Sequence, residues 1–145
     1  MTGVIFCITA TGCKSSLPIV GSDRDANIVV LGGASMNGGG NAAVVRIYQL
    51  SSDTKFQHTS IESFWQNDVD ALGSELIGAS QELVIYPEQT KTLELKLDKE
   101  AQFIGVAADL RSPDPDRWRA VYPVREVRGK QIVVTVGEDR LQASM

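Results

Sequence analysis

The sequence contains a single histidine, His58, and only two cysteines. Zinc sites in proteins are usually assembled from several histidine and cysteine ligands, which this composition does not supply. The Gly-x-Ser-x-Gly motif of serine hydrolases is also absent, as is a Ser-His-Asp order with supporting motifs. We therefore expect no metal, no cofactor and no enzymatic activity, and we expect His58 to be a solvated polar side chain.

Positive charge and long apolar runs are scarce as well. The 14 Lys and Arg are outnumbered by 18 Asp and Glu, which gives a net charge of −4 and a pI near 4.9. Because phosphate binding needs a basic face, nucleic acid is not an expected partner. No stretch reaches the roughly 18 apolar residues of a transmembrane helix. With 43% hydrophobic and 22% charged residues, the chain is expected to fold around one core.

The start of the chain is uncharged, mostly apolar and ends in Ala10-Thr11-Gly12-Cys13. This pattern resembles a secretory signal that ends in a bacterial lipobox, whose cysteine becomes the lipidated first residue of the mature chain. We predict a signal peptide over residues 1–12, lipidation of Cys13 and a tether over residues 13–26. A signal truncated at its start would explain why no basic residue precedes the apolar run. The alternative is an apolar first strand with two ordinary thiols.

Most of the remaining chain has strand character. Residues 42–50 are β-branched in the middle and free of Gly and Pro, which predicts a buried central strand. Residues 90–98 alternate strictly, which predicts a half-solvated strand with Leu93, Leu95 and Leu97 inward. The other expected strands are residues 27–31, 82–86, 103–110, 117–124 and 131–137. Seven strands separated by turn signals favour a mainly β, two-sheet β-sandwich over residues 27–140.

The hydrophobic period changes after the second expected strand. Apolar residues then recur at three- and four-residue steps, as on one face of a helix: Ile61, Trp65, Val69, Leu72 and Leu76. Thr59 and Glu62 fit a capping box, with Thr59 as N-cap. Because Asn67, Asp68 and Gly73 interrupt the pattern, we expect two short helices. They would form an insertion at about residues 56–78, packed on the end or edge of a sheet.

A glycine-rich segment directly precedes the central strand. It consists of Ser35, Met36, Asn37, Gly38, Gly39, Gly40 and Asn41. Such a segment is costly to order and contributes little to a core, so we expect a flexible loop. Phosphate binding is not indicated, because the loop leads into a strand and no lysine follows the glycines. A plain hairpin loop and a partner-binding loop both remain open on these residues alone.

Two tryptophans and their neighbouring arginines allow more than one interpretation. Trp118 is expected to fill the core, with Arg119 or Arg111 stacking or pairing at the edge of the sandwich. The same arginines could contact a partner, since Trp and Arg are enriched in binding hot spots. Exposed Trp65 and Trp118 would instead indicate a periplasmic ligand- or glycan-binding sandwich.

The acidic residues Asp109, Asp114 and Asp116 are the remaining candidates for chemistry. Paired carboxylates can be catalytic when they converge in a pocket. A Ser-Pro-Asp-Pro-Asp segment is a usual turn sequence, however, and arginines nearby can neutralise the acids. We expect these residues to be turn residues.

Several short motifs follow one another in a fixed order after the lipobox-like start. They are Arg46-Ile47-Tyr48-Gln49-Leu50, Phe56, Phe64, Leu72-Gly73, Tyr86-Pro87, Ile104-Gly105-Val106-Ala107-Ala108, Arg111 and Trp118-Arg119. This order resembles the TssJ-type lipoproteins of the bacterial type VI secretion system, over residues 27–137. The resemblance implies a transthyretin-like β-sandwich with a short helical insertion between strands 2 and 3.

The resemblance also implies a function. It implies a non-enzymatic outer-membrane lipoprotein, facing the periplasm, that anchors the type VI secretion membrane complex. In that family the loop between the first and second strands contacts the periplasmic C-terminal region of the large inner-membrane subunit, of the TssM type. In this sequence that loop is residues 35–41. Lys14 follows Cys13 where an Asp would signal inner-membrane retention, so the outer membrane is the expected location.

Overall fold

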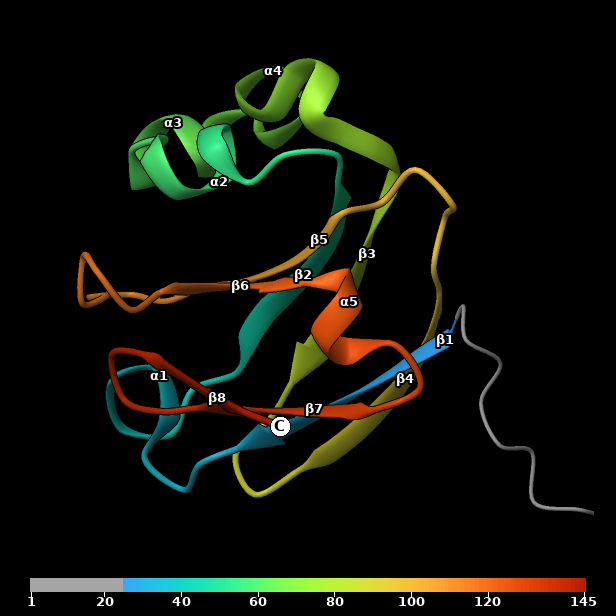
Figure 1. Cartoon of the computed structure of the whole chain (residues 1–145). Helices are drawn as coiled ribbons and strands as arrows, with labels where there is room; N and C mark the ends of the chain where they lie inside the picture. The colour runs from blue at the N-terminus through green and yellow to red at the C-terminus, as the bar shows by residue number, and fades with distance from the viewer. Residues whose placement is uncertain (1–24) are drawn as a thin grey trace, which may run out of the picture.

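A computed structural model describes residues 25–145, in which eight strands form two four-stranded sheets (Figure 1). The sheets have the strand orders β4-β1-β7-β8 and β3-β2-β5-β6. The strands are β1 (Asp25–Gly32), β2 (Ala43–Leu50), β3 (Leu76–Ile85), β4 (Thr90–Lys96), β5 (Phe103–Asp109), β6 (Arg119–Pro123), β7 (Gln131–Val136) and β8 (Leu141–Ser144). The predicted mainly β, two-sheet sandwich is confirmed. The predicted signal peptide, Cys13 and most of the predicted tether lie outside the described residues.

Strand β1 lies inside its sheet, antiparallel to β4 and parallel to β7. Ala26, Ile28 and Val30 alternate toward the core and are 1%, 0% and 0% exposed. The strand begins at Asp25 and not at residue 27, so residues 25 and 26 belong to the sandwich and not to the tether. The alternation predicted for residues 90–98 is confirmed: Leu93 is partly buried in β4, Leu95 is buried in β4, and Leu97, directly after the strand, is also buried.

Strand β2 is central in the second sheet, between β3 and β5. This confirms the prediction made from its β-branched residues. Its register with β3 shifts between Ile47 and Gln49, opposite a segment of β3 that contains Gly78 at φ +66°. Strand β3 is longer than predicted, and β8 was not predicted, because its sequence Leu-Gln-Ala-Ser carries no strand pattern.

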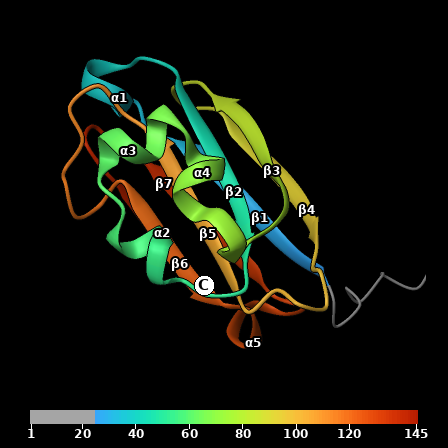
Figure 2. The same cartoon turned by 90° about the horizontal axis from the view of Figure 1, so that it is seen from above.

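The insertion after β2 covers the outer face of the second sheet, as Figure 2 shows. It contains α2 (Thr54–His58), α3 (Ile61–Gln66), α4 (Asp68–Leu72) and the 3-10 turn η1 (Gly73–Glu75). It is therefore three short helices and a turn where two helices were predicted, and it packs on a sheet face and not on an end or edge. Within residues 25–145 every helix is too short or too polar to span a membrane.

The helices and the sheet enclose a second apolar core, separate from the core between the sheets. Its buried members are Tyr48, Leu50, Phe56, Phe64, Leu72, Ala107 and Trp118. The Phe56 ring lies directly over Gly105, where a Cβ atom would be 2.8 Å from two ring carbons. Two details of the predicted helix were wrong. Val69 is 59% exposed, and the side chain that caps α3 is Ser60, which accepts a hydrogen bond from the Ser63 N–H.

Candidate functional site

The glycine-rich loop is an ordered turn and not a flexible segment. Its helical part is α1 (Met36–Gly39), yet Asn37 (φ 49°, ψ 56°) and Gly38 (φ 73°, ψ 38°) have left-handed dihedrals. Gly39 and Gly40 also have positive φ, at 107° and 101°. The Gly39 and Gly40 N–H groups donate to the carbonyls of Ser35 (3.2 Å) and Met36 (2.8 Å). Since only glycine, and to a lesser degree asparagine, adopts this conformation at low cost, the glycine run is a conformational requirement.

Backbone hydrogen bonds attach this turn to the neighbouring β7–β8 turn. The Gly33 N–H donates to Val136, the Asn37 N–H to Gly137 and the Gly38 N–H to Glu138, at 3.0 Å each. The Met36 side chain is fully buried. The loop is therefore held by both its backbone and one apolar side chain.

Asn37 holds the loop together from inside. Among the polar and charged residues of 25–145, Asn37 is the one that is buried, with an exposed fraction of 5%. Its amide group donates to the Ala42 carbonyl (2.7 Å), and its side-chain oxygen accepts from the Arg111 N–H (2.8 Å). Its own carbonyl accepts from the Asn41 side chain (2.9 Å). One side chain thus connects the C-terminal end of the loop with the β5–β6 connection.

The outer side of the loop remains accessible. Ser35, Gly38 and Gly39 are exposed, and Gly40 and Asn41 are partly exposed. The loop shares one end of the sandwich with the β3–β4 turn, the β5–β6 loop and the β7–β8 turn (Figures 1 and 2). We call this end the loop end, comprising residues 34–41, 86–89, 110–117 and 137–140. Of the predicted loop residues, five of seven therefore reach the surface, and Met36 and Asn37 serve as internal supports.

The acidic residues at the loop end support turns. Arg140 pairs with Asp139 (2.8 Å) and with Asp114 (3.7 Å), while Asp114 accepts a hydrogen bond from the Asp116 N–H (2.9 Å). The hydrogen bond from Arg140 lowers the pKa of Asp139. Among residues 25–145, no three His, Cys, Asp or Glu side chains are grouped to hold a metal ion. These contacts fit the expected role of Asp114 and Asp116 as turn residues.

Trp118 is 1% exposed, which confirms that it fills the core. The Arg119 guanidinium stacks on its ring (4.5 Å) and donates to the carbonyls of Phe56 (2.8 Å) and Thr59 (2.6 Å), and also to that of Gln57. Burial lowers the pKa of Arg119. These bonds satisfy carbonyls at the end of α2, so Arg119 is a structural residue.

Trp65 is partly buried under Arg46, whose guanidinium carbon is 5.2 Å from the ring centroid. Its ring also packs against Trp118 and Phe64. Among residues 25–145, Trp118 is buried and Trp65 is only partly exposed, so neither has the exposed ring that the glycan-binding interpretation requires.

A polar network that sequence reasoning missed fixes α4 to the sheet. The Tyr48 hydroxyl donates to Asp68 (2.7 Å), and Arg46 pairs with both Asp68 (3.2 Å) and Glu82 (2.7 Å). Burial, followed by the hydrogen bond to Asp68, raises the pKa of Tyr48 far above its usual value. The sequence of β2 alone could not indicate this network, because the partners of Arg46 and Tyr48 come from α4 and β3.

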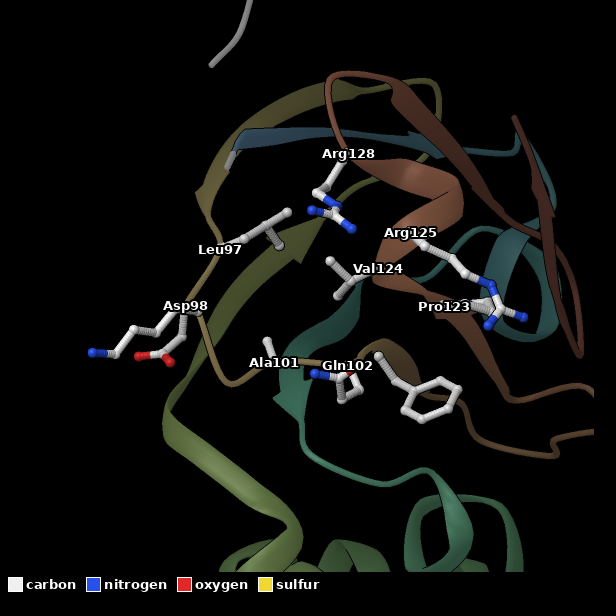
Figure 3. A pocket seen from close by; sticks show the side chains of 10 residues that line it. Leu97, Asp98, Ala101, Gln102, Pro123, Val124, Arg125 and Arg128 are labelled. Atoms are coloured by element: carbon white, nitrogen blue, oxygen red, sulfur yellow. The ribbon is translucent and has the colours of Figure 1, made fainter. Parts of the chain in front are cut away.

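The opposite end of the sandwich carries a hollow of about 430 Å³ (Figure 3). It lies between α5 (Val124–Val127) and the β4–β5 connection, and buried Leu97, Ala101 and Val124 contribute to its lining. Lys99, Arg125 and Arg128 also contribute, and neither tryptophan does. This hollow is at the end where β1 begins, since the Gly129 N–H donates to the Asp25 carbonyl (2.9 Å).

Comparisons with solved structures place this architecture in a class. TssJ1, a type VI secretion lipoprotein from Pseudomonas aeruginosa, superposes with a TM-score of 0.73 at 23% identity, covering 83% of this chain and 95% of that chain. A chain from a structure described as "Type VI membrane complex" gives 0.77 at 24% identity, covering 84% and 98%. A chain from a structure described as the TssM C-terminal domain from EAEC gives 0.74 at 23% identity, covering 83% and 98%. The fold is therefore the transthyretin-like β-sandwich of TssJ-type lipoproteins.

Sequence comparison then identifies the family. A family model described as "Type VI secretion lipoprotein, VasD, EvfM, TssJ, VC_A0113" matches residues 24–139. The chain belongs to this family, which confirms the resemblance noted in its sequence motifs. No curated protein sequence matches the chain.

Proposed function

We propose that this protein is a non-enzymatic outer-membrane lipoprotein that anchors a type VI secretion membrane complex. In this proposal a lipid on Cys13 holds the protein at the periplasmic face of the outer membrane. Residues 35–41 bind the periplasmic C-terminal region of a TssM-type inner-membrane subunit. The family supports a role in type VI secretion, and one structural neighbour is named for a TssM C-terminal domain.

The observation that carries the proposal is the state of the loop. A binding loop that is already ordered avoids the roughly 1–2 kcal/mol per residue needed to order a flexible one. The turn at residues 36–40 is held by internal hydrogen bonds while its outer side stays accessible. The turn also lies at the opposite end of β1 from Asp25, the first described residue. The 8 residues of β1, at about 3.3 Å each, separate Asp25 from the loop end by about 26 Å.

The loop assignment is tested by adding bulk at Ser35, which is exposed and has a negative φ of −103°. We expect Ser35→Arg to weaken binding to a purified TssM-type C-terminal domain at least tenfold in biolayer interferometry. Thr92→Arg, on the exposed face of β4, is the matched control and is expected to bind as the wild type does. Wild-type affinity of Ser35→Arg would refute the loop assignment.

The anchor is tested independently of the loop. Cys13→Ser is expected to move the protein from the outer-membrane fraction to the soluble periplasmic fraction. Mass spectrometry of the mature wild-type N-terminus should show an acylated Cys13. An unmodified mature cysteine, or unchanged membrane association of Cys13→Ser, would contradict the anchoring half of the proposal.

A further inference from the structure

The glycine turn offers a partner very few side chains. Met36 and Asn37 are buried, and the next three residues are glycines. Only Ser35 and Asn41 carry side chains at the surface, and the Asn41 amide group already donates to the Asn37 carbonyl. Binding energy in protein interfaces is concentrated in a few residues, with Trp, Tyr and Arg strongly represented. The turn can therefore supply shape and backbone groups, while side-chain anchors must come from its neighbours.

Tyr86 is a neighbour with the properties of an anchor. It is 55% exposed, and its hydroxyl has no hydrogen-bond partner within residues 25–145. The turn that carries it is fixed to the base of the loop. The Glu88 N–H donates to the Gly32 carbonyl (2.8 Å), and the Gly32 N–H donates to Gln89 (2.9 Å). A Cβ atom on Gly32 would be 2.2 Å from the Tyr86 carbonyl oxygen, so backbone contacts backbone here.

Arg111 is the second neighbour. Its N–H donates to the Asn37 side chain, and its Cδ atom is 3.9 Å from the place of a Cβ on Gly38. Its side chain is exposed, and its guanidinium has no ion pair or hydrogen bond in the described part of the chain. Two nearby arginines differ, because Arg140 pairs with two aspartates and Arg119 is bonded to α2. Arg111 thus has a fixed backbone and an uncommitted charge.

The two residues flank the loop. Figure 2 shows α1 and the segment after it between the β5–β6 loop, which carries Arg111, and the β3–β4 turn, which carries Tyr86. We propose that Tyr86 and Arg111 are the side-chain anchors of the partner interface, with the glycine turn as the surface between them. The partner then presents a carboxylate opposite Arg111 and an apolar surface with a hydrogen-bond acceptor for Tyr86. This inference rests on the proposed function and adds the residues that give it affinity.

The test uses the complete periplasmic body and a purified TssM-type C-terminal domain in biolayer interferometry. Tyr86→Ala and Arg111→Glu are each expected to raise the Kd at least tenfold. Val69→Ala and Arg125→Glu are the matched controls, because Val69 is 59% exposed on α4 and Arg125 is exposed at the opposite end. Both controls are expected to bind within twofold of the wild type. Equal urea midpoints verify that the four variants are folded.

The salt dependence of binding distinguishes the contributions of the two proposed anchors. The loss caused by Arg111→Glu is expected to shrink as NaCl rises from about 0.1 M to about 0.5 M, whereas the loss caused by Tyr86→Ala is not. If the wild type binds but both variants bind within twofold of it, the anchor assignment is refuted and the proposed function stands. If the wild type itself does not bind, the proposed function is refuted and the anchors with it.

Discussion

Substitution of Asn37 offers the sharpest test of the conclusion that the glycine turn is ordered and not flexible. Asn37→Ala removes the hydrogen bonds to Ala42 (2.7 Å) and Arg111 (2.8 Å). Each partner group left without a bond costs about 1–2 kcal/mol in a partly buried position. Alanine at φ 49° adds roughly 1–2 kcal/mol, because its Cβ crowds the backbone in the left-handed region. We expect a total loss of about 3–6 kcal/mol in the free energy of unfolding.

Asn37→Gly separates the two contributions. It removes the same side-chain bonds, but glycine adopts positive φ without the Cβ penalty, so the expected loss is about 2–4 kcal/mol. The alanine variant should therefore be less stable than the glycine variant by about 1–2 kcal/mol. Urea unfolding followed by circular dichroism, with equal m-values, measures both differences.

Two results would contradict this reasoning. Equal stability of the alanine and glycine variants would mean that the left-handed conformation at Asn37 imposes no cost. A loss below about 0.5 kcal/mol in both would mean that the side chain does not hold the loop. At a temperature where both variants are folded, we also expect weaker binding to the TssM-type domain, because the loosened loop must be ordered again on binding.

Three further predictions concern the support beneath the helices and the sheet. Gly105→Ala should lower the free energy of unfolding by about 1–3 kcal/mol, because the new Cβ would be 2.8 Å from the Phe56 ring. Adding Phe56→Leu to the Gly105→Ala chain should recover part of this loss, which a double-mutant cycle measures. Burial raises the pKa of Tyr48, so as pH rises past about 10 the unfolded chain loses this proton first and stability falls. Tyr48→Phe should flatten this fall in urea midpoints measured from pH 8 to pH 11; an unchanged slope would contradict the assignment. Arg119→Lys should cost about 1–3 kcal/mol in urea unfolding, because one ammonium cannot reach the several carbonyls at the end of α2; wild-type stability would contradict this.

The parts of the fold that sequence predicted are those set by local pattern. The alternation in β4 and the β-branched centre of β2 indicated their burial correctly, because one residue in two faces the core of a sandwich. Each of these signals needs only the residues of one segment.

The helical insertion was predicted less well, because its burial depends on the sheet. A single helical period placed Val69 in the core, but the chain breaks at Asn67, which caps α4 and restarts the rotation of the helix. The inward positions are then Phe56, Phe64 and Leu72, which meet Tyr48 and Trp118 on the sheet face. Each helix is too short to be stable alone, so contacts with the sheet decide its position.

Composition singled out the glycine-rich segment and the family resemblance suggested its binding role, which stays a proposal, but the predicted flexibility of the segment was wrong. A glycine run fits both a flexible loop and a backbone with positive φ, and only the dihedrals separate the two. The asparagine before the glycines is a signal for the second, since asparagine tolerates the left-handed region. The partners Arg111 and Gly137 are distant in sequence, and no local pattern connects them with Asn37.

A stiff turn has a mechanical consequence under the proposed function, because the membrane and the partner would pull on opposite ends of β1. A strand at about 3.3 Å per residue is already close to the extended limit of the chain, so tension can pass along its backbone with little lengthening. Strand β1 is also paired with β4 at seven positions and with β7 at six, so axial tension loads many hydrogen bonds together. Force applied at Tyr86 or Arg111 reaches β1 through the bonds at Gly32 and Asn37. A flexible loop would let the partner move before any force was transmitted, whereas the left-handed turn makes the connection rigid from the start.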